Sequence, residues 1–163
     1  MANTCAICGA TINVLQSQKL MDGNYICTKG CRAKGLKYYD YVHSDLDNVK
    51  DHIHQTEVGT KVWQDLMEPL KKTRDKNQKM QSFHPIYIAP SLGLIAVIEA
   101  RGGLFNTKVY ACVYRLENLQ LYRTERMPAR TSGSDKDKMC VHLGFVHTKG
   151  LNDVYIPFDD ETR

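Results

Sequence analysis

The stretch CAICGATINVLQSQKLMDGNYICTKGC, residues 5–31, contains four cysteines in two close-spaced pairs. Cys5 and Cys8 form the first pair, and Cys27 and Cys31 form the second. Zinc takes four soft ligands at the corners of a tetrahedron, about 2.3 Å from the metal, and two pairs on tight turns can supply them. The sequence therefore predicts one structural zinc ion held by these four cysteines.

Glycines stand where the two turns need them. Gly9 follows the first pair and Gly30 lies within the second, and glycine can adopt the positive φ that points backbone N–H groups at the thiolates. Between the pairs, Asp22-Gly23 is flanked by apolar residues, which is a strong hairpin signal. Two knuckles joined through a hairpin predict a zinc ribbon or treble-clef-like finger over residues 1–37. Zinc is expected to fold this segment, because it is too short to fold on a hydrophobic core alone.

The four cysteines also allow interpretations other than structural zinc. Unrelated thiols or two disulfides are alternatives, but the start MANTCAICGA lacks a secretion signal, so a reducing, cytoplasmic location is expected. A catalytic zinc is disfavoured because four thiolates leave no open position for water. Basic residues around the second pair can offset the net charge of about −2 at such a site. These residues are Lys29, Arg32, Lys34 and Lys37.

Length and composition fit one sizeable core with a small appendage. The 163 residues are 42% apolar and 25% charged, with a formal net charge of +4. No apolar run is long enough to cross ~30 Å of hydrocarbon, so no membrane span is expected. The charge is spread evenly along the chain and is too mild to imply nucleic acid by itself.

Residues 44–80 predict a charged helical connector. Ser44 is the expected N-cap of a first helix over about 45–55, because apolar residues follow it along one helical face. A second helix is expected to begin at Thr60, after a glycine. Pro69 should end or kink this helix, since proline removes a backbone donor and clashes with the preceding turn.

Residues 83–163 predict an antiparallel β domain. Five or six runs of β-branched and aromatic residues alternate with turn signals, among them Arg101-Gly102-Gly103. Strands at this spacing predict a small antiparallel barrel or sandwich, so the expected fold class is α+β. The alternation predicts one buried sheet face. Its core residues are Ile88, Leu94, Ala96, Val109, Cys112, Leu119, Leu121, Val141 and Phe145.

Isolated histidines and cysteines outside the finger favour structural roles. His52 and His54 are two residues apart on a helix, which does not place both on one face, and they are expected to be exposed. Cys112 and Cys140 lie in apolar strand patterns, where free cysteine packs as a small hydrophobe. No local sequence marks an activated nucleophile, so the chain is predicted not to be an enzyme.

Three segments together carry a resemblance to a known family. CAICGATINVL (5–15), KLMDGNYICTKGC (19–31) and YRLENLQLYRTE (114–125) resemble uncharacterised bacterial proteins in which a four-cysteine finger of unknown function precedes a pleckstrin-homology-like barrel. The resemblance implies a bound zinc and a pleckstrin-homology-like β domain, but no activity. The sequence differs from the family pattern in having three residues, where two are expected, between Cys27 and Cys31.

Two functions follow from these features. The first is a zinc-containing, non-enzymatic binding module whose partner is another protein or a small ligand. The alternative is a nucleic-acid-binding regulatory protein that uses the finger and one dense basic run. A solvated surface is the simpler interpretation of that run, because a nucleic-acid site needs many basic residues on one surface. The run consists of Lys71, Lys72, Arg74, Lys76 and Lys79.

Overall fold

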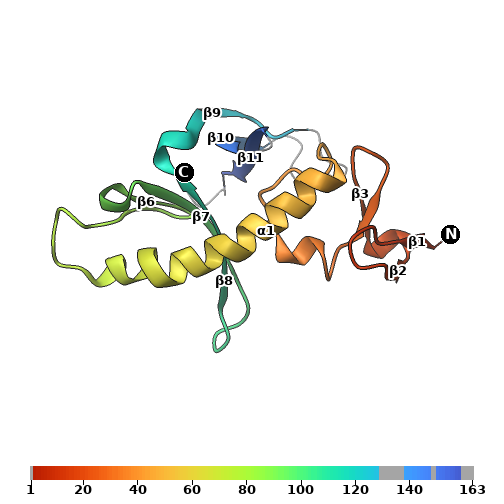
Figure 1. Cartoon of the computed structure of the whole chain (residues 1–163), viewed down its shortest axis with the longest axis horizontal. Helices are drawn as coiled ribbons and strands as arrows, with labels where there is room; N and C mark the ends of the chain where they lie inside the picture. Colours follow the sequence, from red (N-terminus) through yellow and green to blue (C-terminus); the bar gives the residue numbers. More distant parts are fainter. Residues whose placement is uncertain (1, 129–137, 148–149, 159–163) are drawn as a thin grey trace.

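The computed structural model describes residues 2–128, 138–147 and 150–158. It combines an N-terminal cysteine-containing segment, one long helix and two larger antiparallel sheets (Figure 1). The mixed α+β class is therefore confirmed. No helix among these residues is both long enough and apolar enough to cross a membrane.

The N-terminal segment is built from short strand pairs and turns. It holds two antiparallel pairs: β1 (Asn3–Thr4) with β2 (Thr11–Ile12), and β3 (Ser17–Lys19) with β4 (Tyr25–Cys27). Single 3-10 turns follow β2 at Val14–Gln16 and β4 at Arg32–Lys34. Gly23 has a φ of 85° in the β3–β4 turn, which confirms the hairpin predicted at Asp22-Gly23.

One continuous helical segment replaces the two helices expected from the sequence. Helix α1 spans Leu46–Val62 and continues through a π-helical turn, Trp63–Met67, and a 3-10 turn, Glu68–Lys72. Asp45 caps α1, because its side chain accepts the N–H of Asn48 at 2.8 Å. The expected cap, Ser44, instead donates its hydroxyl to the carbonyl of Asp40.

Gly59, where a helix break was expected, is a buried residue inside α1. A Cβ built on Gly59 would lie 2.5 Å from the carbonyl oxygen of Ala111 in the sheet. The neighbouring Thr60 hydroxyl accepts the backbone N–H of Ala111 at 3.0 Å. The glycine therefore permits close helix–strand packing, and this contact is invisible in the local sequence.

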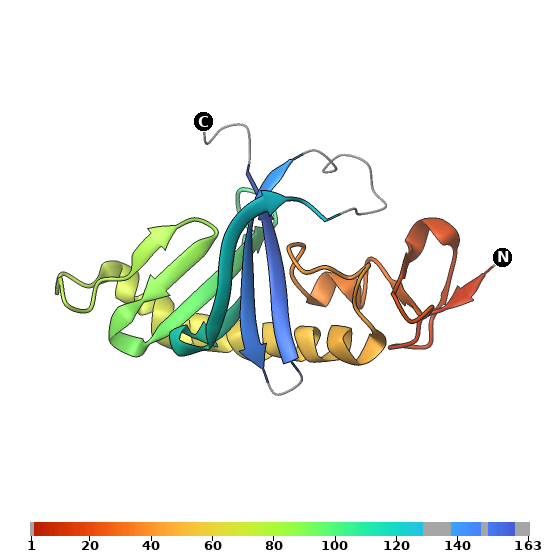
Figure 2. The same cartoon turned by 90° about the horizontal axis from the view of Figure 1, so that it is seen from above.

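The predicted β region forms two antiparallel sheets. The first has the order β5-β6-β7-β8, with β5 (Gln81–Phe83), β6 (Ile86–Ala89), β7 (Leu94–Arg101) and β8 (Lys108–Arg115). The second has the order β11-β10-β9, with β9 (Leu119–Arg126), β10 (Met139–His147) and β11 (Gly150–Pro157). Figure 2 shows β9, β10 and β11 running across the direction of α1.

No closed barrel forms within the described part of the chain, which corrects the barrel expectation. Strand β8 ends the first sheet, and α1 lies along it where Thr60 binds the N–H of Ala111. Covering a sheet edge with a helix leaves no place there for another strand. Strand β9 pairs with β10 in the second sheet instead.

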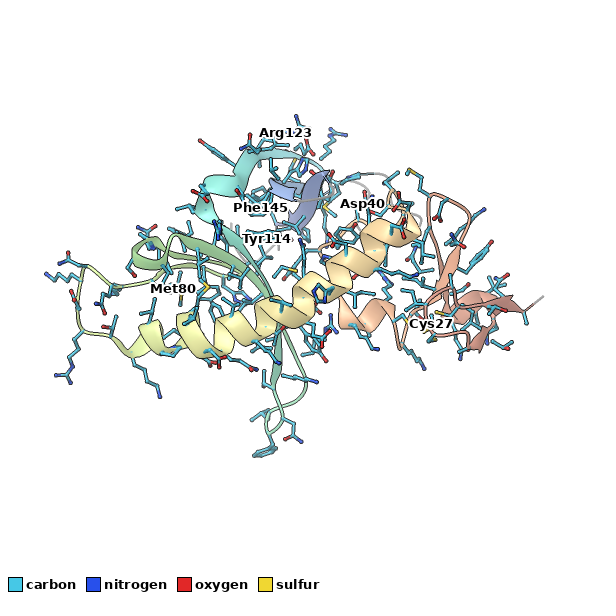
Figure 3. All side chains as sticks on the ribbon, viewed as in Figure 1. Cys27, Asp40, Met80, Tyr114, Arg123 and Phe145 are labelled. Carbon is cyan, nitrogen blue, oxygen red and sulfur yellow. The ribbon has the colours of Figure 1, made fainter. Side chains whose placement is uncertain are left out.

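The core is two-sided, because β7 is buried on both faces. Ile95 and Val97 face a cluster shared with the second sheet, where Tyr114 stacks on Phe145 with ring centroids 4.0 Å apart (Figure 3). Alternate β7 residues pack against Trp63, the first residue of the π-helical turn after α1. Of the predicted core, Ala96, Cys112 and Phe145 are buried, whereas the others are half-buried: Ile88, Leu94, Val109, Leu119, Leu121 and Val141.

Residues 33–41 connect the N-terminal segment to the sheets. The backbone carbonyl of Tyr38 accepts the N–H of Tyr155 at 2.9 Å, and the Glu99 carboxylate accepts the backbone N–H of Lys37 at 2.8 Å. Arg101 pairs with Glu99 at 2.6 Å and donates to the carbonyls of Ala33 and Gly35. This connection is therefore held by hydrogen bonds at several points.

The expectation that His52 is exposed was wrong, because it is fully buried under the connecting segment. Its Nε2 accepts the N–H of Leu36 at 3.0 Å, and the Tyr39 ring stacks on it at a centroid distance of 3.9 Å. Burial lowers the pKa of His52 to about 3, so the ring is neutral at physiological pH. His54, in contrast, is exposed.

Candidate metal centre

The four cysteines predicted from the sequence lie together. Their Sγ atoms are all within 4.8 Å of one another, and the Cys5–Cys31 and Cys8–Cys27 pairs are each 3.8 Å apart. A regular tetrahedron with metal–sulfur bonds of about 2.3 Å has sulfur–sulfur edges of about 3.8 Å. The arrangement can hold one metal ion and is consistent with zinc.

Short turns position the four sulfurs. Cys5 and Cys8 lie in the turn after β1, which Gly9 closes with a φ of 75° and an N–H donated to the Cys5 carbonyl. Cys27 ends β4, and Cys31 caps the following 3-10 turn. Backbone N–H groups also donate to sulfur. The N–H of Cys27 donates to Cys5 Sγ at 3.3 Å, and the N–H of Cys31 donates to Cys27 Sγ at 3.1 Å.

Gly30 has a different role from the one expected. It is not among the glycines with positive φ, so the turn does not use its conformational freedom in that way. A Cβ at this position would lie 2.9 Å from Cys27 Sγ. The glycine therefore leaves room for the sulfur of Cys27.

The thiols differ in how readily they ionise. Burial alone would raise the pKa of Cys5, but the backbone N–H groups of Cys8, Cys27 and Ile7 outweigh it and lower the value to about 6. Burial and the neighbouring cysteine side chains raise the pKa of Cys31 far above its ordinary value. A cation at the centre would let all four sulfurs be thiolates at once, because it offsets their repulsion.

The cysteine-containing segment does not pack alone. Its buried residues, including Ile26, share one apolar cluster with Tyr39 and Tyr41 of the connecting segment and with Val49 of α1. The four-cysteine segment and the start of α1 thus share a common core.

The predicted basic run lies far from the four cysteines. Its residues are exposed: Lys71 and Lys72 end the 3-10 turn, and the other three follow it. Lys71 places its Nζ 5.0 Å above the Trp63 ring and 5.2 Å above the Tyr87 ring. Met80, next to the last residue of the run, and Cys27 lie toward opposite ends of the molecule (Figure 3). The structure therefore does not bring the run and the cysteines into one surface.

Comparisons with known proteins give no relative. No family model matches the chain, and neither a curated protein nor a solved structure matches it. The resemblance to bacterial finger proteins and to a pleckstrin-homology-like domain therefore stays a hypothesis.

Cys112 has two polar neighbours that the sequence did not reveal. Its Sγ lies 3.2 Å from Thr56 Oγ1 and 3.9 Å from His52 Nδ1. All three side chains are buried, and burial raises the pKa of Cys112 to about 11. A neutral thiol without access to solvent is not a nucleophile, so this group fits the predicted core role.

A charged cluster on the second sheet was also missed. His142 Nε2 lies 2.6 Å from Asp153 Oδ1, and its Nδ1 lies 2.8 Å from Glu125 Oε1, in a contact that lacks hydrogen-bond geometry. Arg123 pairs with Glu125 at 2.5 Å, and the His142 ring stacks on Tyr155. The alternation of β10 puts His142 on the face opposite Leu143 and Phe145, but only the strand register brings the carboxylates to it.

Proposed function

We propose that the chain is a zinc-containing, non-enzymatic binding module that receives an extended segment of a partner protein beside its finger. A groove of about 680 Å³ carries this proposal. It runs between the β3–β4 hairpin and residues 39–42 of the connecting segment. Val14 and Leu15 line it and are 70% and 92% exposed, so two adjacent apolar side chains are available there to a partner.

The backbone of β3 supports an extended ligand. In the described residues β3 pairs with β4 alone, so its other edge has no strand neighbour. Thr28 donates to Gln16 and Leu20 donates to Asn24 across the hairpin, so the alternate residues Ser17 and Lys19 turn their backbone groups to the free edge. A peptide strand can add to such an edge through main-chain hydrogen bonds.

Zinc would shape both walls of this groove. Cys27 ends β4, and Cys31 immediately precedes Arg32, which lines the groove and lies 5.2 Å from the Tyr41 ring centroid. Four thiolates complete the tetrahedron of zinc, so the ion supplies structure and no open coordination position for catalysis. We therefore expect peptide binding to depend on zinc without any turnover.

Selection from a random peptide display library against the zinc-loaded chain tests this function. We expect selected peptides to lose binding when zinc is chelated and when Leu15→Asp changes the groove. Leu92→Asp, at an exposed apolar position outside the groove residues, is the matched control and should bind normally. Selected peptides that bind equally well after chelation, or that ignore Leu15→Asp, would contradict the proposal.

The nucleic-acid alternative has less support, because Lys71 already covers two aromatic rings and the run lies away from the finger. We expect non-specific binding no tighter than roughly 10⁻⁵ M at physiological salt. An anisotropy titration with mixed DNA and RNA measures it. Sub-micromolar, salt-sensitive binding that is lost in the Lys72→Ala/Arg74→Ala variant would favour the alternative instead.

A further inference from the structure

Two apolar side chains stand at the tip of the β7–β8 hairpin. Leu104 and Phe105 are 97% and 95% exposed, the two highest values among the exposed large apolar residues of the described chain. They occupy the middle of a turn in which Asn106 donates its N–H to the Gly103 carbonyl at 3.3 Å. Such positions normally hold glycine, proline, asparagine, aspartate or serine. Nothing in the fold requires leucine and phenylalanine there.

The turn holds the tip in one conformation. Gly102 has a φ of 122°, and a Cβ on it would lie 2.0 Å from the Asn106 carbonyl oxygen, so the chain closes tightly at the base of the tip. The Thr107 hydroxyl also donates to the Gly103 carbonyl. Figure 1 shows this hairpin pointing away from α1 and from the second sheet. Leu104 and Phe105 can therefore meet a surface before the body of the protein does.

Basic residues surround the base of the hairpin. Arg101 of β7 lies opposite Lys108 of β8 in the strand register. The hydrogen bonds from Arg101 to the carbonyls of Ala33 and Gly35 bring the exposed Lys34 and Lys37 alongside the hairpin. A hollow of about 270 Å³ beside the strand is lined by Arg32, Lys37, Arg101 and one acid, Glu99, among other residues. Glu99 is already paired with Arg101 at 2.6 Å. The base therefore carries an excess of positive charge.

We propose that the β7–β8 hairpin docks on an anionic lipid surface. Leu104 and Phe105 insert among the acyl chains, while Lys34, Lys37 and Lys108 contact the headgroups. The uncharged tip, residues 102–107, can enter the interface without burying a charge. The negative surface potential of such a membrane attracts the basic residues at the base. Apolar insertion and electrostatic attraction together give the two signals that stable peripheral binding needs.

A lipid surface suits this tip better than nucleic acid does. Bases stack on aromatic rings, so a polynucleotide would use Phe105 and leave Leu104 without a partner. Hydrocarbon accepts both side chains equally. A polynucleotide that binds through Phe105 is therefore a separate outcome of the test.

A tryptophan at the tip reports insertion directly. Phe105→Trp should show a blue shift of its emission with vesicles of equal parts phosphatidylserine and phosphatidylcholine. Tyr122→Trp, at an exposed position of β9, should show none. The native Trp63 is buried and gives a constant background. No shift at position 105, or a shift with polyuridylate and none with vesicles, would overturn the proposal.

Co-sedimentation of the chain with the same vesicles gives the affinity. We expect Leu104→Ser and Phe105→Ser each to weaken binding about tenfold, because each removes a buried apolar side chain. Lys34→Ala or Lys37→Ala should weaken it about fivefold per charge. Tyr122→Ser, at an exposed position of β9, is the matched control and should bind as the unchanged chain does. An unchanged chain that stays in the supernatant, or tip variants that sediment equally well, would rule the docking site out.

Discussion

His52 shows how one side chain can make stability depend on pH. Its pKa is about 3 in the folded chain because of burial, against about 6.5 when unfolded. The folded pKa is the lower one, so this contribution is present above pH 6.5 and is lost as the pH falls toward 3. We expect about 2 kcal/mol of stability to be lost from His52 between pH 6.5 and pH 5.

His52→Gln isolates this effect from the cysteine site. Glutamine can still accept the N–H of Leu36 but does not titrate, so the variant should lose less stability over the same pH range. Urea unfolding of both chains at the two pH values measures the difference. Equal losses in the two chains would show that His52 is not the titrating group.

The convergence of the four cysteines was predictable, whereas the burial of His52 was not. Cys5, Cys8, Cys27 and Cys31 lie in two local turns, so their spacing already defines how they converge. His52 is buried by Tyr39 and Leu36, which reach it through the fold of the connecting segment. Helical spacing alone reports which residues share a face and says nothing of what covers that face.

Gly59→Ala tests the packing of α1 on β8. Alanine is the better helix former by about 1 kcal/mol, but its Cβ would lie 2.5 Å from the Ala111 carbonyl oxygen. The clash is with backbone, so we expect a net loss of about 1–3 kcal/mol. Val58→Ala, at a half-exposed neighbouring position, should change stability by much less. A Gly59→Ala chain as stable as the original in urea would show that the helix can move off the strand.

The strands were easier to predict than the length of the helix and the division of the strands into two sheets. Alternating residues in β9 and turn signals such as Arg101-Gly102-Gly103 give both the strands and their hairpins from local sequence. The continuity of α1 through Gly59, and the absence of a barrel among the described strands, depend instead on contacts between α1 and β8, far apart in the chain. Such contacts leave no local pattern.

At the scale of the whole molecule, metal removal should act beyond the cysteine-containing segment. Ile26 shares its cluster with Tyr41 and with Val49 of α1, so chelation should expose backbone amides in residues 2–36 and also in the first turns of α1. The buried residues of the β7–β8 pair lie in two other clusters, so this pair should keep its protection. Hydrogen exchange with and without a chelator measures this. Faster exchange throughout both sheets would mean that the metal stabilises the entire chain.

The zinc content of the purified chain tests the central claim most directly. A four-thiolate zinc site is worth roughly 10–16 kcal/mol of apparent binding free energy at neutral pH, so the metal should survive purification in chelator-free, reducing buffer. We expect one zinc ion per chain by elemental analysis, lost in Cys31→Ser and retained in the matched variant Cys112→Ala, whose cysteine lies in the core. A chain without metal, or a Cys31→Ser variant that keeps its zinc, would contradict the account.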